Sequence, residues 1–135
     1  MSRAQRLDGG TIAALAATLQ LYLDQRVLSI PFWRMATATP EDIASRAADV
    51  AKGLAMVSVE PVDSVPGAGS VPGRTIASFA VCIHGDPDRT WARLASDADW
   101  PVIGTRRDGA TYLDLRSVAP EDDARLRSTL EQALA

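Results

Sequence analysis

Cysteine, lysine and histidine are almost missing from this sequence, with one of each: Cys82, Lys52 and His84. A single cysteine excludes an intramolecular disulfide and a cysteine-rich metal site. No apolar run approaches the ~18 residues of a membrane-spanning helix. The first residues lack the apolar core of a secretory signal. We therefore expect a cytoplasmic protein with no membrane partner, and we expect Cys82 to be a small buried residue in an apolar strand.

The sequence also has fewer basic than acidic residues, 14 against 17. The formal net charge is −3 and the isoelectric point is about 5.0, which argues against a general nucleic-acid-binding surface. The hydrophobic fraction of 47% is enough for a core, and the length of 135 residues fits one domain.

Four segments carry the apolar spacing and the N-terminal signals of helices. They run from about Thr11 to Val27, from Thr39 to Gly53, from Asp86 through Leu94, and from Pro120 to the end. The first should begin near Asp8 and end at Ser29-Ile30-Pro31, because the residue before a proline avoids helical geometry.

Four shorter segments read as strands. They are Met56–Val62, Ile76–Ile83, Val102–Thr105 and Ala110–Leu115. The second is the most apolar, so we expect it at the centre of the sheet. Asp108-Gly109 between the last two predicts a hairpin, with Gly109 at positive φ.

The order of these segments predicts an α+β fold, with helices packed on a small, mostly antiparallel sheet. We expect a single domain, in which residues 1–28 form a leading junction and long helix and residues 39–135 form the α+β body.

Two segments are candidates for a binding function. The glycine-rich stretch of residues 61–73 either is a plain loop between two strands or lets the backbone approach a ligand closely at Gly67, Gly69, Ser70 and Gly73. Arg3 and Arg6 lie three residues apart before the first helix, and they either are solvated or together hold an oxyanion.

No catalytic residue and no metal site are expected in this chain. His84 ends an apolar strand before Gly85, with no nearby cysteine or serine constellation to suggest a catalytic dyad. Lys52 precedes Gly53 at the predicted end of a helix, where lysine is usually solvated and interacts well with the helix dipole.

Three stretches together resemble the C-terminal part of bacterial selenocysteine synthase, the L-seryl-tRNA(Sec) selenium transferase, a fold-type I pyridoxal phosphate enzyme. They are Arg3-Ala4-Gln5-Arg6-Leu7-Asp8-Gly9-Gly10-Thr11, the run Asp63–Arg74, and Pro101–Gly104 continuing through Tyr112–Arg116 to Pro120–Asp123. Three positions depart from the family pattern: Gly9 replaces a lysine, Ala68 replaces the middle glycine of the glycine-rich run, and Arg74 stands where the family often has an acid.

The resemblance implies the small C-terminal domain of an enzyme whose large, pyridoxal phosphate-binding domain is absent. The parent reaction converts seryl-tRNA(Sec) to selenocysteinyl-tRNA(Sec) with selenophosphate, and the parent enzymes are homo-oligomers. The matching arginines, Arg3 and Arg6, would bind the selenophosphate anion, and the glycine-rich loop would form a wall of the active site. Lys52 does not match the family's cofactor lysine, so this chain should hold no cofactor covalently and should be inactive alone.

Two other interpretations stay open. One is a selenocysteine synthase-like paralogue that acts on a small amino acid or amino sugar. The other is a non-catalytic protein, either a truncated gene product or a stand-alone interaction module. Trp33 is expected to pack against the missing large domain. An extensive exposed apolar surface would favour a fragment over a stand-alone module.

Overall fold

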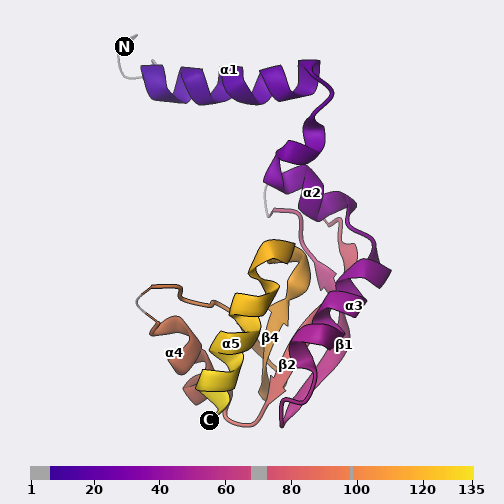
Figure 1. Cartoon of the computed structure of the whole chain (residues 1–135), viewed down its shortest axis with the longest axis vertical. Helices are drawn as coiled ribbons and strands as arrows, with labels where there is room; N and C mark the ends of the chain where they lie inside the picture. Colours follow the sequence, from indigo (N-terminus) through magenta and orange to yellow (C-terminus); the bar gives the residue numbers. More distant parts are fainter. Residues whose placement is uncertain (1–6, 68–72, 98) are drawn as a thin grey trace. The chain divides into compact units, whose positions relative to one another are not determined.

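The structure is a computed structural model that describes residues 7–67, 73–97 and 99–135 (Figure 1). The chain divides into two compact units, Met1–Thr37 and Ala38–Ala135.

The first unit is helical. Helix α1 (Gly9–Leu23) is capped by Asp8, whose carboxylate accepts a hydrogen bond from the Thr11 amide at 3.0 Å. A 3₁₀ turn, η1 (Val27–Ser29), leads to α2 (Pro31–Thr37). None of the residues of α1 is buried. The apolar stripe that predicted this helix is therefore exposed, with Ile12, Leu15, Leu19 and Leu23 all more than half accessible.

The first helix ends earlier than predicted, although Ile30, before Pro31, has the expected non-helical backbone. Helix α1 stops at Leu23, because Gln25 takes a left-handed conformation with φ of 58°. Pro31 opens α2 rather than ending a helix. Proline at the first helical position needs no amide hydrogen bond, and its fixed φ suits the start of a helix.

The second unit is built on a four-stranded antiparallel sheet, in the order β1-β2-β4-β3. The strands are β1 (Val57–Ser64), β2 (Ile76–His84), β3 (Thr105–Arg107) and β4 (Ala110–Asp114). The apolar strand β2 lies inside the sheet, as predicted. Helices and antiparallel strands together make the expected small α+β fold.

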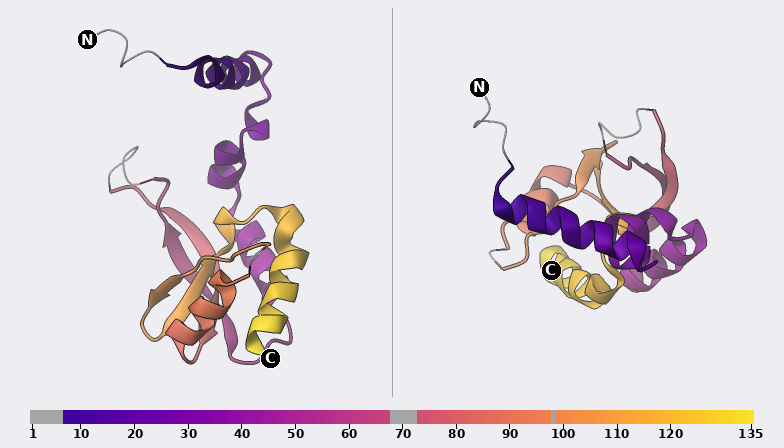
Figure 2. Two further views of the ribbon diagram at one scale, coloured as in Figure 1. Left: turned by 90° about the vertical axis from the view of Figure 1, so that its left-hand side faces the viewer. Right: turned by 90° about the horizontal axis from the view of Figure 1, so that it is seen from above.

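Three helices cover one face of this sheet: α3 (Pro40–Ala51), α4 (Pro87–Ala95) and α5 (Asp123–Leu134) (Figures 1 and 2). The core lies between them and the odd-numbered residues of β1, β2 and β4. Its most buried members are Ile43, Ala47, Val50, Val81, Ile83, Leu94, Leu113, Leu115, Leu126 and Leu130. The even-numbered residues of these three strands face away from the helices, because successive side chains of a strand alternate between the two faces.

The hairpin closes as the sequence predicts, but its strands are shorter than expected. Arg107 pairs with Ala110, and the two loop residues between them, Asp108 and Gly109, have φ of 51° and 74°. Positive φ at both positions matches the right-handed twist of a two-residue hairpin. Strand β3 starts at Thr105 rather than Val102. Leu115 belongs to the 3₁₀ turn η2 (Leu115–Ser117) rather than to β4.

The last helix also begins later than predicted. A 3₁₀ turn, η3 (Pro120–Asp122), precedes α5, which starts at Asp123. The proline and acidic residues that signalled a helix start therefore form a separate tight turn before it.

Candidate functional site

A polar cluster lies on the sheet face that points away from the helices. The register places Ser58 of β1 opposite Cys82 of β2, and Cys82 opposite Tyr112 of β4. Glu60 and His84 lie two residues further along their own strands. Alternation of side chains across the sheet puts all five residues on this one face.

Hydrogen bonds join the members of this polar cluster. The Ser58 hydroxyl lies 2.8 Å from His84 Nε2 and 3.0 Å from Glu60 Oε1. The Tyr112 hydroxyl donates to Glu60 Oε2 at 3.1 Å. His84 Nε2 also lies 3.8 Å from Glu60 Oε1. The expectation that His84 has no cysteine or serine constellation near it is therefore wrong: Ser58 and Glu60 come from strand pairing, and Cys82 lies two residues away on the same strand.

These contacts shift the pKa values of three groups. Hydrogen bonds from Ser58 and Tyr112 lower the pKa of the Glu60 carboxyl, so this group is ionised at neutral pH. Burial raises the pKa of the Cys82 thiol. Hydrogen bonds with Cys82 and Glu60 raise the pKa of the Tyr112 phenol to about 12. At neutral pH the cluster therefore holds one carboxylate, one protonated thiol and one protonated phenol.

The geometry does not match a nucleophilic triad. In a triad the acid orients the imidazole from one ring nitrogen while the serine meets the other. Here Ser58 and Glu60 both approach Nε2 of His84. The protonated Cys82 thiol is also a poor nucleophile, since the thiolate is the reactive form.

A hollow of about 360 Å³ opens beside this cluster, at the start of the glycine-rich loop. Val62, Ser64 and Val65 line one side of it, and Arg107 and Tyr112 line another. The Arg107 guanidinium lies over the Tyr112 ring, 4.2 Å from its centroid. This stacking holds a cation at the edge of the hollow, where it can meet an anionic group.

Asp114 fixes the polar floor of this hollow. Its carboxylate accepts hydrogen bonds from the hydroxyls of Ser64 and Ser78 and from the Arg116 amide. The bonds tie β1, β2 and η2 to one side chain of β4. The loop after β1 therefore leaves the sheet from a fixed point.

The structure describes only part of the predicted site. Gly67 and Gly73, near the two ends of the glycine-rich loop, have φ of 116° and 75°, a region that favours glycine. Arg3, Arg6, Gly69 and Ser70 lie outside the described residues.

Lys52 lies where the sequence predicts it, at the C-terminal cap of α3, with an exposed side chain. It does not line the hollow beside the glycine-rich loop.

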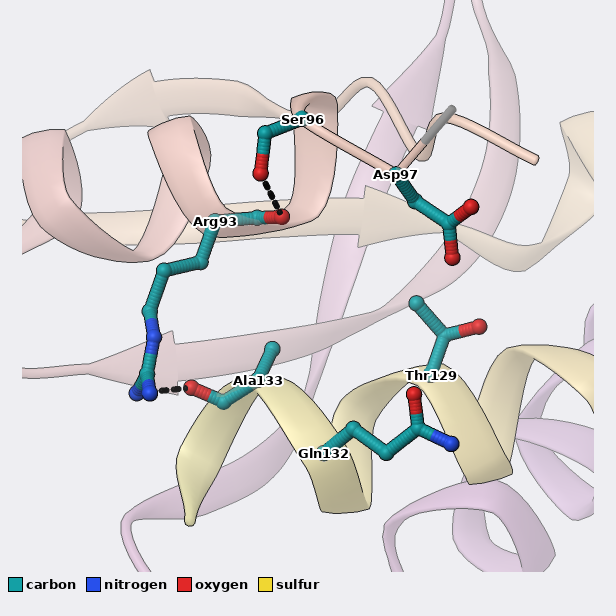
Figure 3. A pocket seen from close by; sticks show the side chains of 6 residues that line it. All are labelled: Arg93, Ser96, Asp97, Thr129, Gln132 and Ala133. Atoms are coloured by element: carbon teal, nitrogen blue, oxygen red, sulfur yellow. Dashed lines mark hydrogen bonds between the residues drawn. The ribbon is translucent and has the colours of Figure 1, made fainter. Parts of the chain in front are cut away.

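A second hollow, of about 260 Å³, lies between α4 and α5 (Figure 3). Arg93 of α4 reaches across it and donates to the Ala133 carbonyl at 2.6 Å, near the end of α5. The Ser96 hydroxyl donates to the Arg93 carbonyl at 2.9 Å. The arginine thus satisfies a carbonyl of the last helical turn, and we interpret this hollow as a structural contact.

Among the helices that the structure describes, none has the length and apolar character needed to cross a membrane.

Comparison with known families gives a match over most of the chain. The family model described as "SelA: L-seryl-tRNA selenium transferase" matches residues 1–119.

Curated relatives named L-seryl-tRNA(Sec) selenium transferase show the same similarity. The protein of Desulfomicrobium baculatum is 35% identical over 100% of this chain, and that of Solidesulfovibrio magneticus is 36% identical over 98%. The protein of Aquifex aeolicus is 29% identical over 100% of the chain. In each case the chain spans 31% of the relative's own length.

Proposed function

The chain belongs to the L-seryl-tRNA selenium transferase family, and on that basis we propose that it is the C-terminal part of a selenocysteine synthase. In the whole enzyme, seryl-tRNA(Sec) would be converted to selenocysteinyl-tRNA(Sec) with selenophosphate as the selenium donor. This chain alone would be inactive, and the rest of the enzyme would hold the cofactor. We place this reaction in the cytoplasm, in a homo-oligomer.

The observation that carries the proposal of a partial enzyme is the exposed apolar stripe of α1. Ile12, Leu15 and Leu19 recur on one side of the helix and are about half accessible. Contiguous exposed apolar surface marks an interaction site in a monomeric protein. The match spans 31% of the length of these relatives, so more than two thirds of each relative lies outside the matched region. We propose that the cofactor domain of the same enzyme covers this stripe.

Pyridoxal phosphate would supply the electron sink of the parent reaction, but the residues of this chain do not fit it. A lysine that binds this cofactor covalently has to lie in a protected site. Lys52 instead caps the C-terminus of α3, with its side chain exposed. The cofactor would therefore be bound elsewhere in the enzyme.

The proposed contribution of this chain is to bind anions and to form a wall of the active site. Arg3 and Arg6 are the proposed ligands of the selenophosphate anion, through charge-assisted hydrogen bonds. The loop with Gly67, Gly69, Ser70 and Gly73 is the proposed wall. Arg107, at the hollow beside that loop, is a further cation that could face an anionic substrate.

The test is a chimaeric enzyme. The part of the Desulfomicrobium baculatum relative that precedes its matched region is joined to this chain, and the conversion of seryl-tRNA(Sec) is measured with selenophosphate and pyridoxal phosphate. We expect the chimaera to convert the substrate and the separate chain to be inactive. Arg3→Ala and Arg6→Ala should each lower the use of selenophosphate by about 10- to 100-fold, the loss of one charge-assisted bond of about 1.5–3 kcal/mol.

Arg89→Ala is the matched control, because Arg89 is an exposed arginine on α4. It should leave the rate unchanged. A folded, cofactor-loaded chimaera that does not act on seryl-tRNA(Sec) would favour a paralogue with a small-molecule substrate or a non-catalytic module. Full activity of both arginine variants would remove Arg3 and Arg6 from the site.

A further inference from the structure

The polar cluster on the open face of the sheet contains three potential metal ligands of different types. One ligand atom each from Glu60, Cys82 and His84 lie within 4.8 Å of one another. All three residues belong to the adjacent strands β1 and β2 of the second unit. The backbone that carries the ligands is therefore fixed by the strand ladder.

We propose that Glu60, Cys82 and His84 form a binding site for a divalent transition-metal ion, and that Zn²⁺ is the ion that this donor set fits. A carboxylate oxygen, a thiolate sulfur and an imidazole nitrogen are the three side-chain donors that Zn²⁺ uses in proteins. Mg²⁺ and Ca²⁺ take oxygen ligands and would gain little from the thiol and the imidazole.

The distances are compatible with a tetrahedral ion after small side-chain movements. Bonds of about 2.0 Å to oxygen and nitrogen and about 2.3 Å to sulfur place tetrahedral ligand atoms roughly 3.3–3.6 Å apart. The observed separation of His84 Nε2 and Glu60 Oε1 is 3.8 Å. Both side chains are partly exposed, so they can move inward by rotation about their own bonds without a change in the core.

Cys82 lies at the floor of the site, and His84 and Glu60 approach it from the two directions along the strands. An ion would enter from the solvent side, between the imidazole and the carboxylate. The Ser58 hydroxyl now bridges these two groups and would turn away. As the metal–sulfur bond forms, the Cys82 thiol releases its proton to solvent. The fourth position of the ion would be open to water, as in zinc sites with three protein ligands.

The site is independent of the hydrophobic core. Its residues lie on the face opposite to α3, α4 and α5, and the four strands are paired without an ion. The chain should therefore fold without metal and bind the ion afterwards. This property allows binding to be measured on the folded, untagged chain, with no histidine tag to compete for the metal.

Cobalt(II) is the probe, because it takes the same tetrahedral sites as Zn²⁺ and reports thiolate coordination by absorption. Titration of the untagged chain with Co²⁺ should give one-to-one saturation, with a thiolate-to-cobalt charge-transfer band and the visible bands of a tetrahedral ion. Zn²⁺ should displace the cobalt and remove both signals. Circular dichroism should show the same fold before and after the titration.

Single substitutions assign the ligands. Cys82→Ser should remove the charge-transfer band. His84→Ala and Glu60→Gln, at partly exposed positions that should not disturb folding, should each weaken Co²⁺ binding by at least about tenfold, which is the scale of even second-shell effects on metal affinity. Ser58→Ala is the matched control, since it removes the hydrogen bonds of the Ser58 hydroxyl to His84 and Glu60 but leaves all three ligands. It should bind Co²⁺ as tightly as the parent chain or more tightly.

The proposal fails if Co²⁺ gives no charge-transfer band at saturating concentrations, or if the band persists in Cys82→Ser. It also fails if His84→Ala and Glu60→Gln both bind Co²⁺ as the parent chain does. Equal weakening by Ser58→Ala and by the ligand variants would indicate a disturbed sheet instead of a metal site, and would likewise overturn it.

Discussion

Arg46 of α3 and Asp123 of α5 form an ion pair at two points. Nε donates to Oδ2 at 2.7 Å, and Nη2 donates to Oδ1 at 2.7 Å. The same guanidinium donates to the carbonyls of Leu115 and Val118, at 3.3 and 2.8 Å. One side chain therefore joins α3, the turn after β4 and the first residue of α5.

Replacing Arg46 should destabilise the second unit. Arg46→Ala leaves the Asp123 carboxylate and two carbonyls without this donor, so we expect the free energy of unfolding to fall by about 2–3 kcal/mol. Arg46→Lys should recover only part of this, because an ammonium group cannot reproduce the planar fork. Urea denaturation measures both values. The exposed pair Arg127–Glu131 is the control: Glu131→Gln should cost less than about 0.5 kcal/mol. If Arg46→Lys were as stable as the parent chain, the two parallel hydrogen bonds to Asp123 would not be the source of the stability.

Gly104→Ala should destabilise the fold through a steric clash. A Cβ at Gly104 would lie 2.7 Å from Leu113 Cδ2, 2.8 Å from Thr111 Cγ2 and 3.0 Å from the Tyr112 carbonyl oxygen. Overpacking of this kind lowers the free energy of unfolding by about 1–3 kcal/mol. Thermal unfolding would detect this as a lower melting temperature. Gly9→Ala is the control, since a Cβ there meets no atom within 4 Å. Equal melting temperatures for the Gly104→Ala variant and the parent chain would show that the contact is easily relaxed.

Gly109→Val should destabilise the β3–β4 hairpin through the backbone. Gly109 has φ of 74°, and no atom lies within 4 Å of a Cβ built on it. The cost is therefore conformational, at roughly 1–2 kcal/mol for a left-handed residue with a side chain. Gly109→Asn should cost less, because asparagine tolerates this region. If the valine and asparagine variants have the same melting temperature, the backbone conformation at Gly109 does not determine the stability of this turn.

The stability of the turn after α4 should depend on pH through Asp97. Hydrogen bonds from the amides of Trp100 and Asp99, at 3.0 and 2.9 Å, lower the pKa of its carboxyl below 3.8. A group with a lowered folded-state pKa stabilises the protein above its unfolded pKa, and this contribution is lost as the pH falls through the folded value. Asp97→Ala should therefore melt below the parent chain at neutral pH, and the difference should narrow under acid conditions. Asp99→Ala keeps both amides and should show no such pH dependence.

Lys52 should not form a stable adduct with pyridoxal phosphate. It is exposed at the end of α3, and the described residues around it form no enclosed site that would protect an imine. Incubation with pyridoxal phosphate, borohydride reduction and peptide mass spectrometry should give no stoichiometric label on Lys52. A specific, stoichiometric label there would overturn the proposal that the cofactor belongs to another part of the enzyme.

Features that depend on neighbouring residues were predictable from the sequence. The caps at Asp8, Thr39 and Asp86 all accept the expected amide hydrogen bonds. The Asp108-Gly109 turn closes the hairpin. In each case a short motif fixes the local backbone, whatever the rest of the chain does.

Features that depend on strand register were not predictable. Alternation shows that Ser58 and Glu60 share a face, and that Cys82 and His84 share a face. It does not show that Ser58 pairs with Cys82, and this pairing is what assembles the polar cluster. Helix α2 was missed for a different reason, because Pro31 serves equally well as a helix stop and as a helix start.

The exposure of α1 has a consequence for how this segment acquires its order. A helix of 15 residues that buries none of them depends on local helix propensity, and isolated helices of about 12–15 residues are only marginally stable in water. Its helix–coil equilibrium would then be separate from the global unfolding of the α+β body. Association with a covering domain would include folding of the helix. For the same buried area, this contact would be weaker than one between preformed surfaces. The helical content of α1 would then show whether the enzyme is assembled.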